Sequence, residues 1–123
     1  MKNQCQLITY PDSLGQNLRE LQHIVDTYFH DLVGGIHILP FFPSSADRGF
    51  APTTYESVDP IFGSWTEIEN LAQRYEIMVD FMYNHISRQS EFFADFERRG
   101  VESQYADMFI RYSKFWPGGE PNK

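Results

Sequence analysis

The chain has 123 residues, of which 41% are hydrophobic and 16% aromatic, so it carries enough apolar material for a packed core and is not globally disordered. Its net charge of −7 argues against nucleic acid or an anionic membrane surface as a partner. A single cysteine, Cys5, leaves no internal disulfide. No apolar run approaches the ~20 residues of a membrane span, and the start lacks a signal-peptide pattern. We therefore expect a soluble cytoplasmic protein.

The first part of the chain predicts two short strands separated by a helix. Residues Cys5–Tyr10 form a β-rich run. Ser13 and Gln16 fit a capping box at the start of a helix. The apolar face of this helix consists of Leu14, Leu18, Leu21, Val25 and Tyr28. Gly34 and Gly35 are expected to end this segment, and Ile36–Leu39 is the second predicted strand.

Residues 40–63 show no helical period and contain four prolines, so they predict a long loop. A loop of this length inside a compact domain is usually either functional or disordered. Its aromatic content argues against disorder. These aromatic residues are Phe41, Phe42, Phe50, Tyr55 and Phe62.

Beyond this loop the pattern returns to helices and a strand. Ser64 and Glu67 form a second capping box, followed by a helical stripe from Trp65 to Tyr75. Residues Ile77–Tyr83 are nearly all apolar, which is typical of a strand buried on both faces of a parallel sheet. Two more helices are marked by Phe92, Phe93 and Phe96, and by Tyr105, Met108, Phe109 and Tyr112, before a loop at 117–123.

Alternating strands and helices predict an α/β fold with a parallel sheet. In such folds functional residues gather beyond the carboxyl ends of the strands. Here those positions are Pro11 and Asp12, the loop 40–63, and Asn84 with His85.

Two groups of residues at these positions are candidates for binding. His85 can donate a hydrogen bond to a ligand hydroxyl, with Asp80 orienting the Asn84–His85 turn; the alternative is a hydrogen-bonded strand aspartate beside an ordinary loop histidine. In the loop, Asp47 and Phe50 combine a carboxylate for sugar hydroxyls with an apolar ring for the sugar's C–H face. The alternative there is a solvated Asp47–Arg48 charge pair beside an anchoring aromatic ring.

Catalytic and metal-binding hypotheses from the same residues are weak. Asp47 and Asp80 do not make a convincing acid/base pair, because Asp80 is expected inside a strand. His37, Asp80 and His85 lack a recurring metal-ligand spacing. Glycine-rich phosphate loops, nucleophile elbows and paired cysteines are absent from the sequence.

Several segments together resemble the sucrose phosphorylases of the α-amylase superfamily. They are QLITYPDSLG, GGIHILPFFPSSADRGFAP, FGSW, MVDFMYNHIS, ESQYADMF and KFWPGGEP, in this order along nearly the whole chain. The fourth segment resembles the superfamily's first conserved region, with its D-x-x-x-N-H pattern. This signature is moderately specific alone and strong in combination with the long loop.

The resemblance implies a (β/α)₈ TIM barrel, of which residues 1–123 would be the incomplete N-terminal part of the catalytic domain, with about three βα units. It also implies a retaining transfer of glucose from sucrose to inorganic phosphate, giving α-glucose 1-phosphate and fructose, without a metal or organic cofactor. Sucrose and phosphate would be the partners. The oligomeric state is left open.

By the same resemblance, Asp47 and His85 match residues that hydrogen-bond glucose, and Phe50 matches the aromatic platform beside it. Asp80 and Asn84 match the other signature residues, with a supporting role. The family's nucleophile, acid/base and transition-state-stabilising carboxylates come from later strands, so no catalytic residue is expected in this chain, which is expected to be inactive alone.

Three alternatives stay open at this point. The enzyme can be a phosphorylase of a related glucoside, such as sucrose 6′-phosphate or glucosylglycerate. It can be an α-glucosidase-type hydrolase of the same superfamily. Finally, the chain can be a non-catalytic carbohydrate-binding α/β module.

Overall fold

A computed structural model describes residues 3–116 and 118. The chain divides into two compact units, Met1–Ser87 and Arg88–Lys123. None of the helices within the described ranges has the length and apolar composition that crossing a membrane requires.

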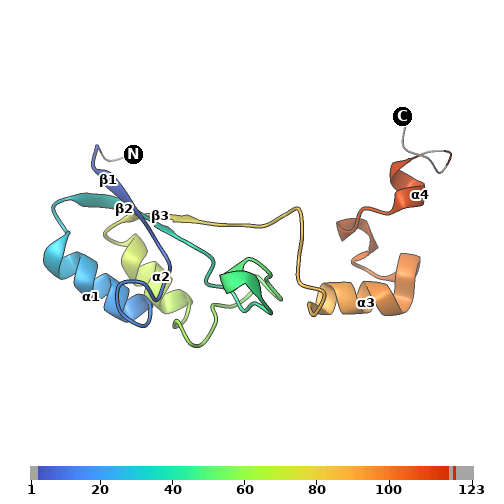
Figure 1. Cartoon of the computed structure of the whole chain (residues 1–123), viewed down its shortest axis with the longest axis horizontal. Coiled ribbons are helices and arrows are strands. Elements are labelled where there is room, and N and C mark those ends of the chain that lie inside the picture. The colour runs from blue at the N-terminus through green and yellow to red at the C-terminus, as the bar shows by residue number, and fades with distance from the viewer. Residues whose placement is uncertain (1–2, 117, 119–123) are drawn as a thin grey trace. The chain divides into compact units, whose positions relative to one another are not determined.

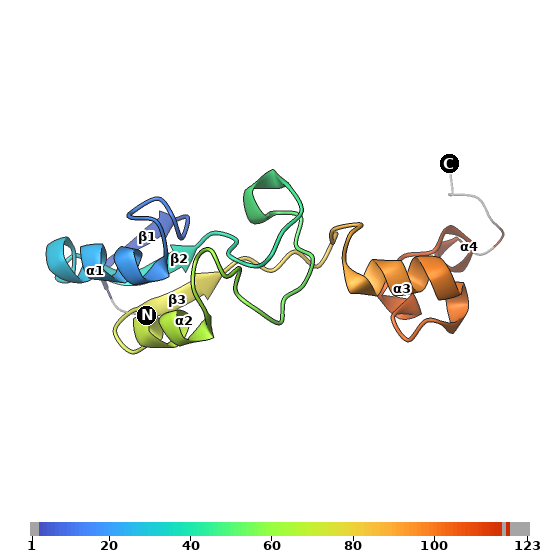
Figure 2. The same cartoon turned by 90° about the horizontal axis from the view of Figure 1, so that it is seen from below.

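The first unit is a three-stranded parallel sheet with two helices on one face (Figures 1 and 2). The strands are β1 (Cys5–Thr9), β2 (Val33–Ile38) and β3 (Glu76–Val79), and they lie in the order β1-β2-β3. Helix α1 (Leu18–Tyr28) connects the first two strands, and α2 (Trp65–Ala72) precedes the third. The predicted α/β class and parallel sheet are thus confirmed.

The strand register separates a covered face of the sheet from an open one. Leu7, Ile36 and Ile77 are neighbours in one row and belong to the core beneath the helices. The next row contains Ile8, His37 and Met78 on the opposite face, because successive side chains of a strand alternate. Ile8 is 62% exposed and Met78 is 46% exposed, so no second layer from the described residues of the first unit covers this face.

The core lies between the covered face and the helices. Its largest fully buried side chains come from α1, β2, the segment after β2, and α2. They include Leu18, Leu21, Val25, Ile36, Ile38, Phe41 and Leu71. The predicted helical stripes are thus confirmed for Leu18, Leu21 and Val25 and for Ile68 and Leu71, but not for their end members, because Tyr28 and Trp65 are exposed.

The predicted start of the first helix is wrong. Asn17, not Ser13, caps α1: its Oδ1 accepts a hydrogen bond from the Glu20 amide at 3.0 Å. Ser13 instead lies in a turn, where its amide donates to the Tyr10 carbonyl at 3.2 Å. Gly15, with φ of 103°, separates this turn from the helix. The second capping box, between Ser64 and Glu67, is confirmed.

Two strand boundaries also differ from the prediction. Gly34 and Gly35 lie inside β2 instead of ending the preceding segment. A Cβ at Gly35 would approach the Glu76 carbonyl of β3 to 3.1 Å, so glycine allows the close pairing of these strands. Strand β3 ends at Val79, and its exposed residues contradict the expected burial on both faces, because β3 is an edge strand with one open face.

The second unit is helical. Helix α3 (Glu91–Arg99) confirms the third predicted helix, whereas the fourth is wrong over most of its expected length. In its place are two 3₁₀ turns, Gly100–Glu102 and Ala106–Met108, and the short helix α4 (Tyr112–Phe115). Two aromatic residues expected in the fourth helix pack instead on α3: Tyr105 meets Phe92 with ring centroids 5.0 Å apart, and Phe109 stacks on Phe96 at 4.8 Å. The loop expected at 117–123 lies, except for Gly118, outside the described residues.

Candidate functional site

Three segments with polar side chains among them follow the carboxyl ends of the three strands. They are Tyr10–Asp12 after β1, the connection 39–64 after β2, and residues 80–87 after β3. Because parallel strands end at the same edge of a sheet, these segments belong to one edge. The sequence had nominated the same positions.

Buried aromatic rings fix the base of the long connection. Phe41 and Phe42 are buried, and the Phe42 ring meets the Tyr55 ring edge-on at 5.0 Å. The Tyr55 hydroxyl donates a hydrogen bond to the Met82 carbonyl at 2.6 Å, which links the loop to the segment after β3. Burial raises the pKa of Tyr55, partly offset by this hydrogen bond, so the phenol stays neutral. The loop is therefore ordered, as its aromatic content predicted.

The tip of the loop is a tight turn at Asp47–Gly49. Asp47 and Arg48 have φ of 59° and 47°, a left-handed conformation that residues with a Cβ rarely adopt. Gly49 continues it with φ of 97°. Ser44 links the two sides of the loop just before and after this turn. Its hydroxyl lies 2.8 Å from the Ala51 carbonyl oxygen and also accepts a hydrogen bond from the Ala51 amide at 3.2 Å.

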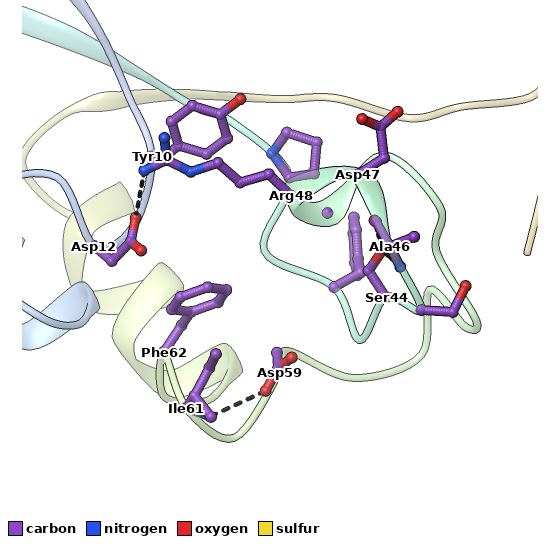
Figure 3. Close-up of a pocket in the computed structure, with 13 residues that line it drawn as sticks. Tyr10, Asp12, Ser44, Ala46, Asp47, Arg48, Asp59, Ile61 and Phe62 are labelled. Carbon is purple, nitrogen blue, oxygen red and sulfur yellow. Dashed lines mark hydrogen bonds and ion pairs between the residues drawn. The ribbon is translucent and has the colours of Figure 1, made fainter.

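Arg48 does not pair with Asp47. This corrects the alternative raised from the sequence, in which the two residues form a solvated charge pair. Its Nη2 lies 3.3 Å from Asp12 Oδ1, and its guanidinium carbon lies 3.8 Å from the centre of the Tyr10 ring. The contact joins the loop to the segment after β1. Figure 3 shows the Asp47 carboxylate and the Arg48 guanidinium leaving the turn in different directions.

A hollow of about 290 Å³ opens between this turn and residues 59–62, which precede α2 (Figure 3). Asp47 and Arg48 line it together with Tyr10 and Asp12. The remaining lining residues are Pro40, Phe42, Ser44, Ser45, Ala46, Gly49, Asp59, Ile61 and Phe62. Phe50 and His85 are not among them, so the hollow holds only one of the three predicted sugar-binding residues.

The structure brings His85 and Phe50 together elsewhere on the loop. His85 Nε2 lies 2.7 Å from the Phe50 carbonyl oxygen, so this nitrogen carries a proton and donates it. His85 Nδ1 lies 3.0 Å from Asn84 Oδ1. A second link joins the same two segments, because the Ser87 amide donates to the Pro52 carbonyl at 2.8 Å. Asn84, His85 and Phe50 thus form one contact group.

Asp80 lies immediately after β3, not inside it as expected. Its Oδ2 lies 3.1 Å from His37 Nε2, with both side chains mostly buried. Through this contact Asp80 joins the ends of β2 and β3. The hypothesis from the sequence was that Asp80 orients the Asn84–His85 turn. His37 faces the open side of the sheet beside Ile8 and Met78, so the pair supports that face.

Among residues 3–116 and 118, no group of three or more histidine, cysteine, aspartate or glutamate side chains is arranged to hold a metal ion. The carboxylates at the strand ends have separate environments: Asp12 pairs with Arg48, and Asp80 pairs with His37. Within the described residues the exposed Asp47 carboxylate takes part in no hydrogen bond or ion pair, so it is able to accept hydrogen bonds from a ligand.

Sequence reasoning missed two members of the site, Tyr10 and His37. The sequence pattern places Tyr10 at the end of a strand and gives His37 only a place in a weak metal hypothesis. Both contacts are long-range: Tyr10 and Arg48 are 38 positions apart, and His37 and Asp80 are 43 positions apart. Alternation along β2 was the one available signal for His37.

Comparison with known proteins identifies the family. The family described as alpha amylase, catalytic domain, matches residues 9–123. This chain belongs to the alpha-amylase catalytic-domain family. Its three strands and two helices are therefore βα units of that family's (β/α)₈ barrel.

Two curated relatives match nearly the whole chain. Sucrose 6(F)-phosphate phosphorylase from Thermoanaerobacterium thermosaccharolyticum is 54% identical over 123 residues, which are 100% of this chain and 25% of that protein. Sucrose phosphorylase from Streptococcus mutans serotype c is 50% identical over 121 residues, 98% of this chain and 25% of that protein. This chain spans about a quarter of the length of these relatives.

The fold comparison agrees. The crystal structure of sucrose 6F-phosphate phosphorylase from Thermoanaerobacter thermosaccharolyticum superposes with a TM-score of 0.90 and 53% identity. The match covers 99% of this chain and 25% of the other. The resemblance to glucosyl phosphorylases seen in the sequence is thus confirmed.

Proposed function

We propose that this chain supplies part of the glucose-binding wall of a retaining phosphorylase, which transfers glucose from sucrose to inorganic phosphate and gives α-glucose 1-phosphate and fructose. The observation that carries the proposal is the 50–54% identity to phosphorylases along essentially the entire chain. The residues at the strand ends support it, because they present a free carboxylate, an aromatic ring and a histidine to one edge of the sheet.

In the proposed reaction, Asp47 accepts hydrogen bonds from glucosyl hydroxyls, because its carboxylate is exposed and a carboxylate offers several acceptor positions. The Phe50 ring covers the sugar's C–H face. His85 holds Phe50 through its backbone carbonyl and contributes its ring to the same wall. Asp80 and Asn84 have supporting roles, the first through His37 and the second through His85.

Retention of configuration needs two displacements at the glucosyl C1. A carboxylate first replaces fructose, whose bridging oxygen takes a proton from an acid, and a phosphate oxygen then replaces the carboxylate. The two carboxyl groups must lie about 5 Å apart. We propose that both come from outside these 123 residues, so that this chain binds the sugar but does not form or break bonds by itself.

For the glucosyl donor, one observation favours a second candidate. The relative with 54% identity acts, by its name, on sucrose 6(F)-phosphate, and the one with 50% identity on sucrose. We propose sucrose as the donor and keep its 6(F)-phosphate as the alternative. In either case the glucosyl half is the same, and the residues proposed here bind that half.

The test uses a chimeric enzyme, called the joined protein below. In it, these 123 residues replace the matching quarter of the Thermoanaerobacterium thermosaccharolyticum enzyme. We expect it to release glucose 1-phosphate from sucrose or sucrose 6(F)-phosphate only when phosphate is present. Equal sugar release without phosphate would indicate a hydrolase. The 123-residue chain alone is expected to show no turnover, because positioning groups cannot replace a missing nucleophile.

Substitutions in the joined protein test the residue roles. Asp47→Ala and His85→Ala are each expected to lower kcat/KM by about 100-fold, since lost positioning of a bound substrate costs that much. Asp31→Ala is the matched control, because Asp31 lies just before β2, at the opposite edge of the sheet. Near-normal activity of both site variants would remove these residues from the sugar pocket.

A non-catalytic module remains the alternative of another class. It predicts that the isolated chain unfolds in one cooperative transition, whereas a barrel segment with an open apolar face is expected to bind apolar dyes and unfold without cooperativity.

A further inference from the structure

The turn at Asp47–Gly49 needs an external support. Three successive residues have positive φ, and two of them, Asp47 and Arg48, carry a Cβ. Such a conformation persists in a non-glycine residue only when the surrounding structure holds it. The turn belongs to an exposed loop tip, so packing against a core does not supply that support.

Two contacts hold the turn from different strand ends. Gly49 lies against Pro40, close enough that a Cβ would come within 2.7 Å of the Pro40 carbonyl oxygen. Arg48 reaches the segment after β1, where its guanidinium lies 3.8 Å above the Tyr10 ring and 3.3 Å from Asp12. A planar guanidinium can stack on a ring and bind a carboxylate at once, which fixes its orientation.

The direction of Asp47 depends on this anchor. Asp47 and Arg48 are adjacent, and their side chains leave the left-handed turn in different directions (Figure 3). Anchoring Arg48 on Tyr10 and Asp12 therefore fixes the backbone that aims the Asp47 carboxylate, although no contact joins the two side chains. We infer that Arg48, seated on Tyr10 and Asp12, is a positioning residue for Asp47 in glucosyl binding. The inference rests on the proposed function.

The inference distinguishes Arg48 from a general surface charge. The stack on Tyr10 needs a flat cation, so a lysine at this position keeps the charge but loses the geometry. Replacing Tyr10 removes the ring on which the Arg48 guanidinium stacks, without changing the charge of the site. Both changes are expected to act on Asp47 rather than on folding.

The activity test is a double-mutant cycle in the joined protein. Arg48→Ala is expected to lower kcat/KM for the glucosyl donor about 10- to 100-fold, with Arg48→Lys and Tyr10→Leu also reduced and the melting temperature unchanged. In an Asp47→Ala background the same Arg48→Ala change is expected to have an effect within about twofold, because Arg48 acts through Asp47. Arg19→Ala is the control: Arg19 forms a comparable ion pair with Glu67 at 3.4 Å, away from the turn.

Independent losses that multiply in the double variant, or full activity of Arg48→Ala, would overturn the inference. A crystal structure of the Arg48→Ala joined protein decides the matter even if phosphorolysis is absent, which would refute only the proposed function. Relaxation of the turn, with a moved Asp47 carboxylate, supports the role of Arg48. An unchanged turn, with Asp47 still at φ near 59°, overturns it.

Discussion

Gly49 gives the sharpest test of how the loop tip is built. Its φ of 97° is unfavourable for any residue with a Cβ, and an added Cβ would lie 2.7 Å from both Cβ and O of Pro40. Real Cβ atoms do not come so close to other heavy atoms, and proline and its backbone have little freedom to move away. Gly49→Ala therefore combines a backbone penalty with a steric one.

The size of the effect follows from these two costs. The left-handed conformation costs a non-glycine residue about 1–2 kcal/mol. Overpacking against a fixed neighbour adds about 1–3 kcal/mol. The sum, about 2–5 kcal/mol, is a destabilisation of the closed loop by at least roughly 30-fold, since 1.4 kcal/mol corresponds to a factor of ten.

Hydrogen exchange of the joined protein measures this local stability directly. The reporters are amides within the loop, namely Phe50, which donates to the Asp47 carbonyl at 3.0 Å, and Ser45, which donates to Ala51 at 3.0 Å. We expect their exchange in Gly49→Ala to be at least roughly 30-fold faster than in the parent, by the sum above.

Gly100 provides the matched control. It also has a positive φ, of 57°, but an added Cβ would meet nothing within 4 Å. Gly100 has φ of 57° with ψ of −126°, so Gly100→Ala should pay a backbone cost of about 1–3 kcal/mol without a steric one, and only near residue 100. If Gly49→Ala exchanged no faster at the loop than the parent, the packing of the turn on Pro40 would be refuted.

Three other predictions concern the frame of the site. Tyr55→Phe removes the 2.6 Å hydrogen bond to the Met82 carbonyl, and we expect a loss of about 1–2 kcal/mol in local stability, seen as faster exchange in both linked segments. Burial, with Asp26 as hydrogen-bond partner, raises the pKa of Tyr75 from 10.0 to about 12, so the folded state holds this proton more tightly. That contribution is complete below pH 10 and is lost as pH rises through about 12; the melting temperature of Tyr75→Phe should fall less over this window than that of the parent. In the isolated chain, Ile8→Thr with Met78→Thr should reduce the binding of an apolar dye, and unchanged binding would mean that the open face is not what the dye contacts.

The sequence predicted those parts of the fold that depend on local periodicity. The stripe of α1, the capping box of Ser64 and Glu67, and the alternation of strands and helices are all signals within a few residues. The start of α1 was missed because Ser13 and Gln16 match a capping-box pattern, whereas the chain turns at Gly15, with φ of 103°, and Asn17 caps the helix.

The third strand was mispredicted for a different reason. The apolar run Ile77–Tyr83 is long enough for a strand, but pairing with β2 ends at Val79. Ile77 packs on the core, but Met78, Phe81 and Tyr83 are exposed, so this part of the pattern reflects the environment of a closed barrel that three strands cannot form. Hydropathy reports where a side chain is buried in the complete fold, not in the segment alone.

The site shows the same division between local and distant information. Position along the chain nominated Asp47, Phe50 and His85, because all three follow strand ends. It could not show that His85 donates to the Phe50 carbonyl, or that Arg48 turns away from Asp47 toward Tyr10. These contacts join segments that are 35 and 38 residues apart, and no periodicity links them.

The three strand ends together explain how a loop with little core of its own is held in place. The segment after β1 holds the loop through Arg48, Pro40 after β2 packs against Gly49, and His85 after β3 binds the Phe50 carbonyl. Each anchor lies within two residues of Asp47 or Phe50 or on one of them. Loss of one anchor therefore shifts a side chain proposed to touch glucose while the sheet beneath stays intact, which is why we expect substitutions here to change binding more than folding.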